Sequence, residues 1–219
     1  MTATSGTVHV VDDDASWRTS AARLLSVAGY DVVLYESAEQ FLATAELDGP
    51  GCLLLDLRMP GLSGLELQQR LAQRTLPVVF VSGHGDIPTS VLAIKAGAED
   101  FLSKPVDSGV LFSAIERAIA RDCAERDGRR QHDALRARVD ALTPRERIVF
   151  DAVVRGKLNK QIAADLGTAE RTIKWHRHNL MEKLQVASFA ELVSLAEHLG
   201  LVSAHDRPTP GFSSAAQQH

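Results

Sequence analysis

The chain has 219 residues, of which 45% are hydrophobic and 24% charged, and its formal net charge is −4. These values are ordinary for a soluble globular protein with one large or two small domains. The apolar runs are far shorter than the roughly 18 residues of a membrane span, and no secretory signal is visible. These short runs exclude a membrane-spanning protein. The only two cysteines, Cys52 and Cys123, are widely separated and predict a cytoplasmic protein with reduced thiols.

The charges are unevenly distributed along the chain. Residues 1–121 contain 15 acidic and 9 basic side chains, whereas residues 141–219 contain 8 acidic and 10 basic ones. Residues 122–140 contain five of each sign. An acidic part followed by a mildly basic part predicts two domains with different partners.

Strand-like and helix-like segments alternate over residues 7–121. This alternation predicts an α/β doubly wound (βα)₅ domain with a five-stranded parallel sheet and helices on both faces. The first helix is expected to bury an apolar face made of Trp17, Ala21, Leu24, Leu25 and Ala28. Later helix starts are marked by the capping boxes Ser37–Gln40 and Ser63–Glu66 and by the N-cap candidates Asp86 and Asp107.

Four apolar runs of this region end in polar groups. The runs at 8–11, 52–55, 78–81 and 100–102 lead, in order, to Asp12 and Asp13, to Asp56, to Ser82 and to Lys104. Parallel strands end at the same edge of a sheet, so three carboxylates, a hydroxyl and an ammonium are expected to converge. Such a group suits a divalent cation and a phosphoryl group; the alternative is a buried ion network with no further role.

Residues 7–121 resemble the receiver domain of bacterial two-component response regulators. The matching motifs are Asp12-Asp13, Asp56 followed by Met59-Pro60-Gly61 and Gly64, then Ser82, and then Lys104-Pro105. The resemblance implies that a sensor histidine kinase phosphorylates Asp56 and that Lys104 pairs with the phosphoryl oxygens. It also implies a switch made of Ser82 and Phe101; an ordinary core role for Phe101 in its strand is the alternative.

The same resemblance implies a Mg²⁺ ion at this edge. Asp13 and Asp56 would bind the ion directly, Asp12 through water, and Arg58 through its backbone carbonyl. Arg58 and His84 occupy positions that flank the attacking water in this family, where they would set the lifetime of the acyl phosphate. A merely solvated role for these two side chains is the alternative.

Two segments outside this region lack a strong core pattern. Residues 122–140 are highly charged and are interpreted as a linker, largely helical with a weak point at Gly128; a disordered linker is the alternative. Residues 203–219 are rich in Pro, Ser and Gln and are expected to form a disordered tail.

Residues 141–202 show four helix patterns and no strand pattern. The first helix has a specific start signal, Thr143-Pro144-Arg145-Glu146, which combines a capping box with Pro at the first helical position. A short helix over 159–166 ends at Gly167, and Thr168 is expected to cap the next helix, over 169–184. Two helices joined by a short turn with Gly form a helix-turn-helix pattern.

This second region resembles the LuxR-type four-helix DNA-binding domain of FixJ/NarL-type regulators. The resemblance rests on residues 142–146, 159–163 and 172–176. It implies that Lys174, Trp175 and His178 enter the major groove of double-stranded promoter DNA. The side chains expected at the DNA phosphates are Lys160, Arg171, Thr172 and Arg177.

The sequence as a whole predicts a phosphorylation-controlled transcription factor and not an enzyme. Phosphorylation is expected to produce a homodimer through the fourth helix, fifth strand and fifth helix, and RNA polymerase is a candidate further partner. The candidate interface charges are Lys95, Asp100, Glu116 and Arg117. Two alternatives remain: a haloacid-dehalogenase-like phosphatase with Asp56 as nucleophile, which would need an Asp where Arg58 stands, and an interaction module whose phosphorylation is vestigial.

Overall fold

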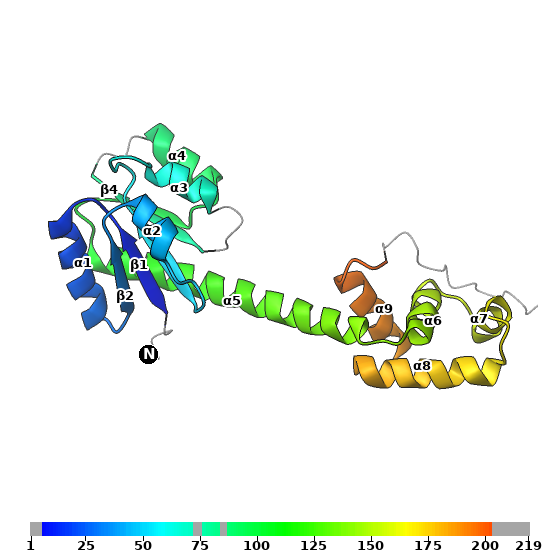
Figure 1. Cartoon of the computed structure of the whole chain (residues 1–219). Helices are drawn as coiled ribbons and strands as arrows, with labels where there is room; N and C mark the ends of the chain where they lie inside the picture. Colours follow the sequence, from blue (N-terminus) through cyan, green and yellow to red (C-terminus); the bar gives the residue numbers. More distant parts are fainter. Residues whose placement is uncertain (1–5, 72–75, 84–86, 203–219) are drawn as a thin grey trace, which may run out of the picture. The chain divides into compact units, whose positions relative to one another are not determined.

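The structure is a computed structural model that describes residues 6–71, 76–83 and 87–202. The chain divides into two compact units, Met1–Gly128 and Arg129–His219 (Figure 1). Each unit has a hydrophobic core of its own. The predicted roles of His84, Asp86 and the tail 203–219 fall outside the described residues. No helix among the described residues is long and apolar enough to cross a membrane.

The first unit contains a five-stranded parallel sheet with the strand order β2-β1-β3-β4-β5, as the alternating pattern predicted. The strands are β1 (Thr7–Val11), β2 (Asp31–Tyr35), β3 (Gly51–Leu55), β4 (Val78–Ser82) and β5 (Asp100–Ser103). The helices are α1 (Ala15–Val27), α2 (Ala38–Thr44), α3 (Gly64–Arg70), α4 (Ile87–Lys95) and α5 (Ser108–Asp140). Every residue of β3 and β4 is buried, which explains their uninterrupted apolar sequences.

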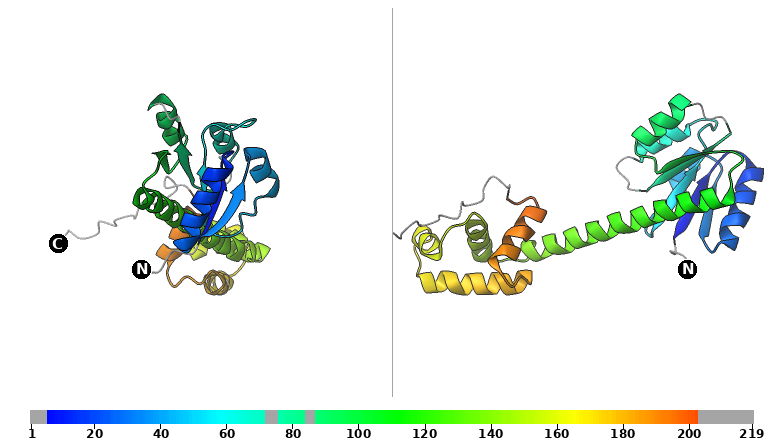
Figure 2. Two further views of the ribbon diagram at one scale, coloured as in Figure 1. Left: turned by 90° about the vertical axis from the view of Figure 1, so that its left-hand side faces the viewer. Right: turned by 180° about the vertical axis from the view of Figure 1, so that it is seen from behind.

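Helices cover both faces of this sheet (Figure 2). On one face, α1 and the first turns of α5 pack on the strands through residues such as Leu25 and Ile115. On the other face, α2, α3 and α4 contribute Phe41, Leu67 and Ala93. Right-handed crossovers between parallel strands produce this arrangement and leave the carboxyl ends of the strands at one edge.

The helix starts agree only in part with the sequence predictions. The capping box of Ser63 and Glu66 is present, and the Asp107 carboxylate accepts from the first amides of α5. Ser37 caps α2, but the side chain of Gln40 accepts from the amide of Glu36 and not from that of Ser37. The predicted capping box is therefore incomplete. The N-cap of α1 is Asp14, which the sequence reading had not assigned.

Helix α5 runs without a break through the predicted linker, including Gly128. Its contacts with the first unit continue past residue 121, because Asp122 is fully buried and accepts from the Gly51 amide at 2.9 Å. Arg126 pairs with Asp122 at 2.7 Å and also donates to the carbonyls of the segment before β3. This clamp fixes the middle of α5 to the edge of the sheet opposite the strands' carboxyl ends.

The second unit consists of the last turns of α5 and the helices α6 (Pro144–Val154), α7 (Asn159–Asp165), α8 (Glu170–Leu184) and α9 (Phe189–His198). Its core takes residues from all of them, including Val139 of α5. The capping box of Thr143 and Glu146, with Pro144 at the first position, is confirmed. The prediction that Thr168 caps α8 is wrong: the N-cap is Ala169, which offers no side-chain acceptor.

Candidate functional sites

Three of the predicted polar residues meet at the carboxyl edge of the sheet. The Lys104 ammonium lies 2.5 Å from Asp12 Oδ2 and 3.0 Å from Asp56 Oδ1. Asp12 and Asp56 are buried, whereas the side chain of Lys104 keeps 19% of its surface exposed. The ends of β1, β3 and β5 therefore build one charged cluster from residues that lie far apart in the sequence.

The electrostatics of this cluster favour an additional positive charge. Burial raises the pKa of Asp12, and the hydrogen bond from Lys104 offsets only part of that effect. Burial also acts to lower the pKa of Lys104, but its bonds to Asp12 and Asp56 outweigh this and leave the pKa raised. Two carboxylates, those of Asp12 and Asp56, thus share one ammonium, and Asp13 follows Asp12 with an exposed side chain.

The oxygen donors at this edge fit a hard divalent cation in their chemistry. Asp12, Asp13 and Asp56 offer carboxylates, and their excess negative charge is the observation that favours a cation. In the arrangement present, two of these carboxylates contact Lys104. Within the described residues, no three His, Cys, Asp or Glu side chains are already grouped around one point.

The other predicted residues of this site lie on its borders. Asp13 and Arg58 are exposed, and Ser82 is buried at the end of β4, where its carbonyl accepts from the Lys104 amide at 2.9 Å. Phe101 is half-buried and stacks on Phe80 with ring centroids 6.0 Å apart.

Hydrogen bonds within the loop after β3 hold it close to Asp56, the residue with which it begins. Asp56 Oδ2 accepts from the Arg58 amide at 2.7 Å, and the Gly64 amide donates to the Leu57 carbonyl at 3.1 Å. A Cβ at position 64 would lie 2.3 Å from the backbone oxygen of Asp56. Glycine at position 64 therefore allows this close approach, and any larger residue would push the Asp56 backbone away.

Two residues of α1 that sequence reasoning did not assign to the site contact it directly. The Trp17 ring lies with its centroid 4.3 Å from the Lys104 ammonium, and Arg18 donates to the Asp12 carbonyl at 2.6 Å. Trp17 had been placed on the buried face of α1, of which Ala21 and Leu25 are buried and Leu24 is 38% exposed. The helical period placed Ala21 and Leu25 correctly, whereas the prediction for Leu24 is wrong, and no local signal indicated the contact of Trp17 with a residue 87 positions later.

The second candidate site is the exposed face of α8. Lys174, Trp175 and His178 are exposed, and the opposite face buries Ile173 and Leu180. This is the division that the sequence predicted. Lys174 also forms an ion pair with Glu170 one turn earlier, at 3.6 Å.

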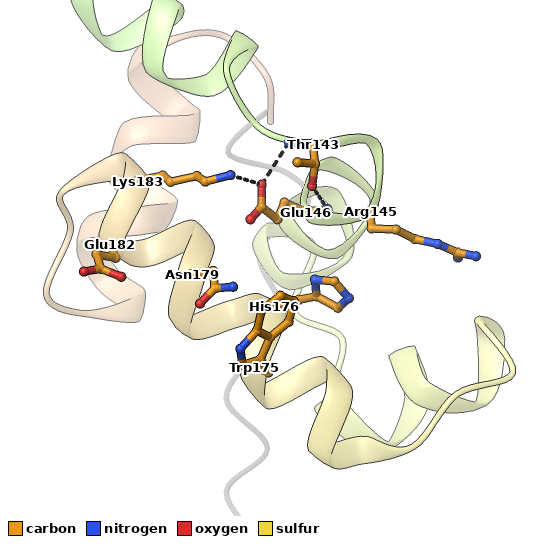
Figure 3. A pocket seen from close by; sticks show the side chains of 8 residues that line it. All are labelled: Thr143, Arg145, Glu146, Trp175, His176, Asn179, Glu182 and Lys183. Carbon is orange, nitrogen blue, oxygen red and sulfur yellow. Dashed lines mark hydrogen bonds and ion pairs between the residues drawn. The ribbon is translucent and has the colours of Figure 1, made fainter.

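Contacts on both flanks hold α8 in place. On the α6 side, buried Glu146 accepts from the Thr143 amide at 2.9 Å and from Lys183 at 2.7 Å (Figure 3). Desolvation would raise the pKa of Glu146, but these hydrogen bonds leave the pKa lowered. On the α7 side, Arg177 donates to Asn159 at 2.7 Å.

The groove between α6 and α8 is open and partly polar. Its volume is about 540 Å³, and Figure 3 shows the Trp175 and His176 rings lining it near Arg145. Within the described residues, the Nδ1 atom of His176 is buried without a hydrogen-bond partner. Of the residues predicted at the DNA phosphates, Lys160, Arg171 and Thr172 are exposed.

Comparison with protein families matches both units. Residues 8–116 match the response regulator receiver domain, and residues 140–196 match the bacterial regulatory proteins of the luxR family. Nodulation protein W of Bradyrhizobium diazoefficiens is 42% identical over 208 residues, which cover 94% of this chain and 92% of that protein. The transcriptional regulatory protein FixJ of Rhizobium meliloti is 43% identical over 195 residues, covering 88% of this chain and 96% of that protein.

Solved structures show the same likeness. The response regulator StyR is 46% identical, with a TM-score of 0.80 over 88% of this chain and 98% of that chain. Full-length FixJ from B. japonicum is 40% identical, with a TM-score of 0.53 over 90% of this chain and 98% of that chain. The family consists of transcriptional regulators and not of classical enzymes, so the phosphatase alternative is not favoured. The chain belongs to the two-component response regulators that join a receiver domain to a LuxR-type helix-turn-helix domain, and it is a phosphorylation-activated transcriptional regulator.

Proposed function

We propose that Asp56 is the residue that accepts the phosphoryl group from a sensor histidine kinase. The observation that carries this proposal is the contact of Asp56 with Lys104 at the carboxyl edge of the sheet. A carboxylate oxygen of Asp56 attacks the phosphorus, the P–N bond of the kinase phosphohistidine breaks, and its electron pair stays on the imidazole nitrogen. The product is an acyl phosphate on Asp56.

The neighbouring residues have distinct roles in this proposal. Lys104 leaves its carboxylate partners to bind the phosphoryl oxygens, and the Ser82 hydroxyl donates to one of them. Phe101, stacked on Phe80 in the structure, then changes its packing as Ser82 moves. Asp12, Asp13, Asp56 and the Arg58 carbonyl would hold Mg²⁺, which neutralises the charge of the transferring phosphoryl group.

Phosphorylation with acetyl phosphate and Mg²⁺, followed by mass measurement, tests the role of Asp56. Asp56→Asn keeps the shape but removes the attacking carboxylate, so the gain of one phosphoryl group should disappear. Asp31→Asn, at the opposite edge of the sheet, is the matched control and should be labelled like the parent. Substantial label on the Asp56→Asn protein would show that another residue is the acceptor.

Phosphorylation, in this proposal, promotes a two-fold dimer through α4, β5 and α5. Helix α4 exposes apolar side chains on more than one side, among them Ile87, Leu92 and Ile94, which are exposed by 81%, 59% and 46%. Charged groups of α4, β5 and α5 accompany them, among them an Asp100–Arg117 pair at 2.6 Å and the exposed Lys95 and Glu116. A mixed apolar and charged patch suits a reversible, self-complementary interface.

Sedimentation velocity with and without acetyl phosphate tests the dimer. The phosphorylated protein should sediment as a dimer at micromolar concentration, and Leu92→Arg should keep it monomeric while labelling of Asp56 is unchanged. Identical monomeric behaviour of the parent in both states would contradict this part of the proposal.

The exposed face of α8 is proposed to read promoter DNA, with Lys174, Trp175 and His178 at the bases. The backbone contacts are assigned to Lys160, Arg171, Thr172 and Arg177. Lys174→Ala should relax base preference at one position of each half-site, and Lys160→Ala should weaken all sites alike. Site selection from random DNA measures both effects; an unchanged preference after Ala substitution at 174, 175 and 178 alike would contradict the assignment.

The division of the chain follows from these roles. We assign residues 7–121 to the receiver, 122–140 to the linker and 141–202 to the DNA-binding domain. The kinase and the promoter are both reached in the cytoplasm, which is the proposed location. RNA polymerase is the partner that an activator of this kind would contact at the promoter.

A further inference from the structure

Trp17 is the aromatic residue whose ring faces the ammonium of the charged cluster. Its ring centroid lies 4.3 Å from the Lys104 ammonium, and the same ammonium is bonded to Asp12 and Asp56. The positive charge is therefore held between two carboxylates and the negatively polarised face of an indole. These contacts give the flexible four-carbon side chain of Lys104 a defined position.

The indole itself is well fixed. Trp17 is half-buried on α1, packs against the core beneath that helix, and its amide donates to the Asp14 carboxylate at 3.2 Å. The next residue, Arg18, donates to the Asp12 carbonyl at 2.6 Å and so ties the first turn of α1 to the end of β1. These two hydrogen bonds fix the backbone at the start of α1, and the packing of the ring against the core holds the ring itself.

We propose that Trp17 is a positioning residue for phosphorylation, acting through Lys104. The inference rests on the proposed role of Asp56. The ring keeps the ammonium at the edge where Asp56 attacks and shields one side of it from water, so that its charge acts more strongly on the phosphoryl oxygens. With acetyl phosphate, the P–O bond to the acetyl group breaks, acetate leaves with the electron pair, and the Asp56–phosphorus bond forms.

Two substitutions separate the ring's π face from its bulk. Trp17→Phe retains an aromatic face, whereas Trp17→Leu retains only an apolar side chain. The rate constant for phosphorylation by acetyl phosphate, followed by mass, should stay within about twofold for Trp17→Phe and fall about three- to tenfold for Trp17→Leu. Leu24→Ala, a partly exposed position two turns along α1, is the control and should leave the rate unchanged.

A double-mutant cycle with Lys104→Ala distinguishes positioning from general support of the fold. When Lys104 is absent, Trp17→Leu should cause no further loss of rate, and circular dichroism melting should confirm that each protein is folded. Calorimetric titration with Mg²⁺ should give a dissociation constant within about twofold of the parent, because Trp17 supplies no oxygen ligand.

The inference would be overturned by a Trp17→Leu rate equal to the parent's, by an equal loss in Trp17→Phe, or by full additivity in the cycle. Its failure is distinguishable from failure of the proposed function. Label remaining on Asp56→Asn would contradict the acceptor assignment, whereas label confined to Asp56 with no effect of Trp17→Leu would contradict this inference alone.

Discussion

The close approach of Gly64 to the phosphoacceptor loop gives a prediction whose size follows from the structure. In Gly64→Ala, the new Cβ would lie 2.3 Å from the Asp56 carbonyl oxygen and 3.0 Å from the ring of Phe80. Ordinary contact begins near 3.4 Å, so the two backbone segments must separate by about 1 Å. Both neighbours belong to the buried centre of the site, and neither is the free end of a flexible side chain.

The substitution should affect both stability and reactivity. Overpacking of this kind costs about 1–3 kcal/mol, which corresponds to a Tm lower by about 4–12 °C for a unit of this size. A shift of the attacking carboxylate by about 1 Å should slow phosphorylation about 10- to 100-fold.

Thermal melting and acetyl phosphate labelling, the latter far below the Tm, measure the two effects. Gly128→Ala is a matched control, because a Cβ there meets nothing within 4 Å in the middle of α5. It should raise stability by about 0.5–1 kcal/mol and leave labelling unchanged. A Gly64→Ala protein with the parent's Tm and labelling rate would refute the argument from the close approach.

Three further substitutions test single contacts by urea titration. The pKa of Glu146 is lowered in the fold, so its stabilising pair is fully present above its ordinary pKa and is lost as the pH falls through the lowered value; Lys183→Met should therefore destabilise strongly near pH 7 and progressively less in acid. Burial lowers the pKa of His9, so below the ordinary pKa the unfolded chain binds a proton that the folded state does not, and stability falls; His9→Phe should therefore lose less stability than the parent as the pH falls from about 7 to 5. Asp122→Asn keeps the acceptor for the Gly51 amide but removes a buried charge, and it should cost about 3 kcal/mol. The contacts concerned would be contradicted by a parent-like urea midpoint of Lys183→Met or Asp122→Asn at pH 7, or by a parent-like pH dependence of the midpoint in His9→Phe.

The fold and the main candidate cluster were predictable because they depend on periodicity and strand direction. Buried parallel strands read as apolar runs, and the residue after each run must reach the common edge. This reasoning placed Asp12, Asp56 and Lys104 together, as the structure does. The capping boxes of α3 and α6 were predictable because they are local, three residues apart.

The sequence could not predict which of several available partners a side chain would choose. Trp17 was expected on the core side of α1, and the structure adds the ammonium of Lys104 as its neighbour. Arg177 was expected at a DNA phosphate, a role that stays a prediction, but it bonds to Asn159 in the structure. Thr168 was expected as a cap, yet α8 starts one residue later because the chain is extended at Ala169. These choices depend on three-dimensional neighbours that spacing along the chain does not reveal.

The first strand to emerge from the ribosome, β1, is an inner strand of the sheet. β1 lies between β2 and β3, so one of its edges stays unpaired until residues 51–55 have been synthesised. The apolar face of β1, β3 and β4 stays exposed for longer, because it is covered only when Leu111 to Ile119 of α5 have been synthesised. Unpaired edges and uncovered apolar faces are the surfaces through which nascent chains associate wrongly. The receiver core can be completed only once α5 has been translated as far as Ile119, and the same helix later supplies Val139, the first buried core residue of the second unit along the chain.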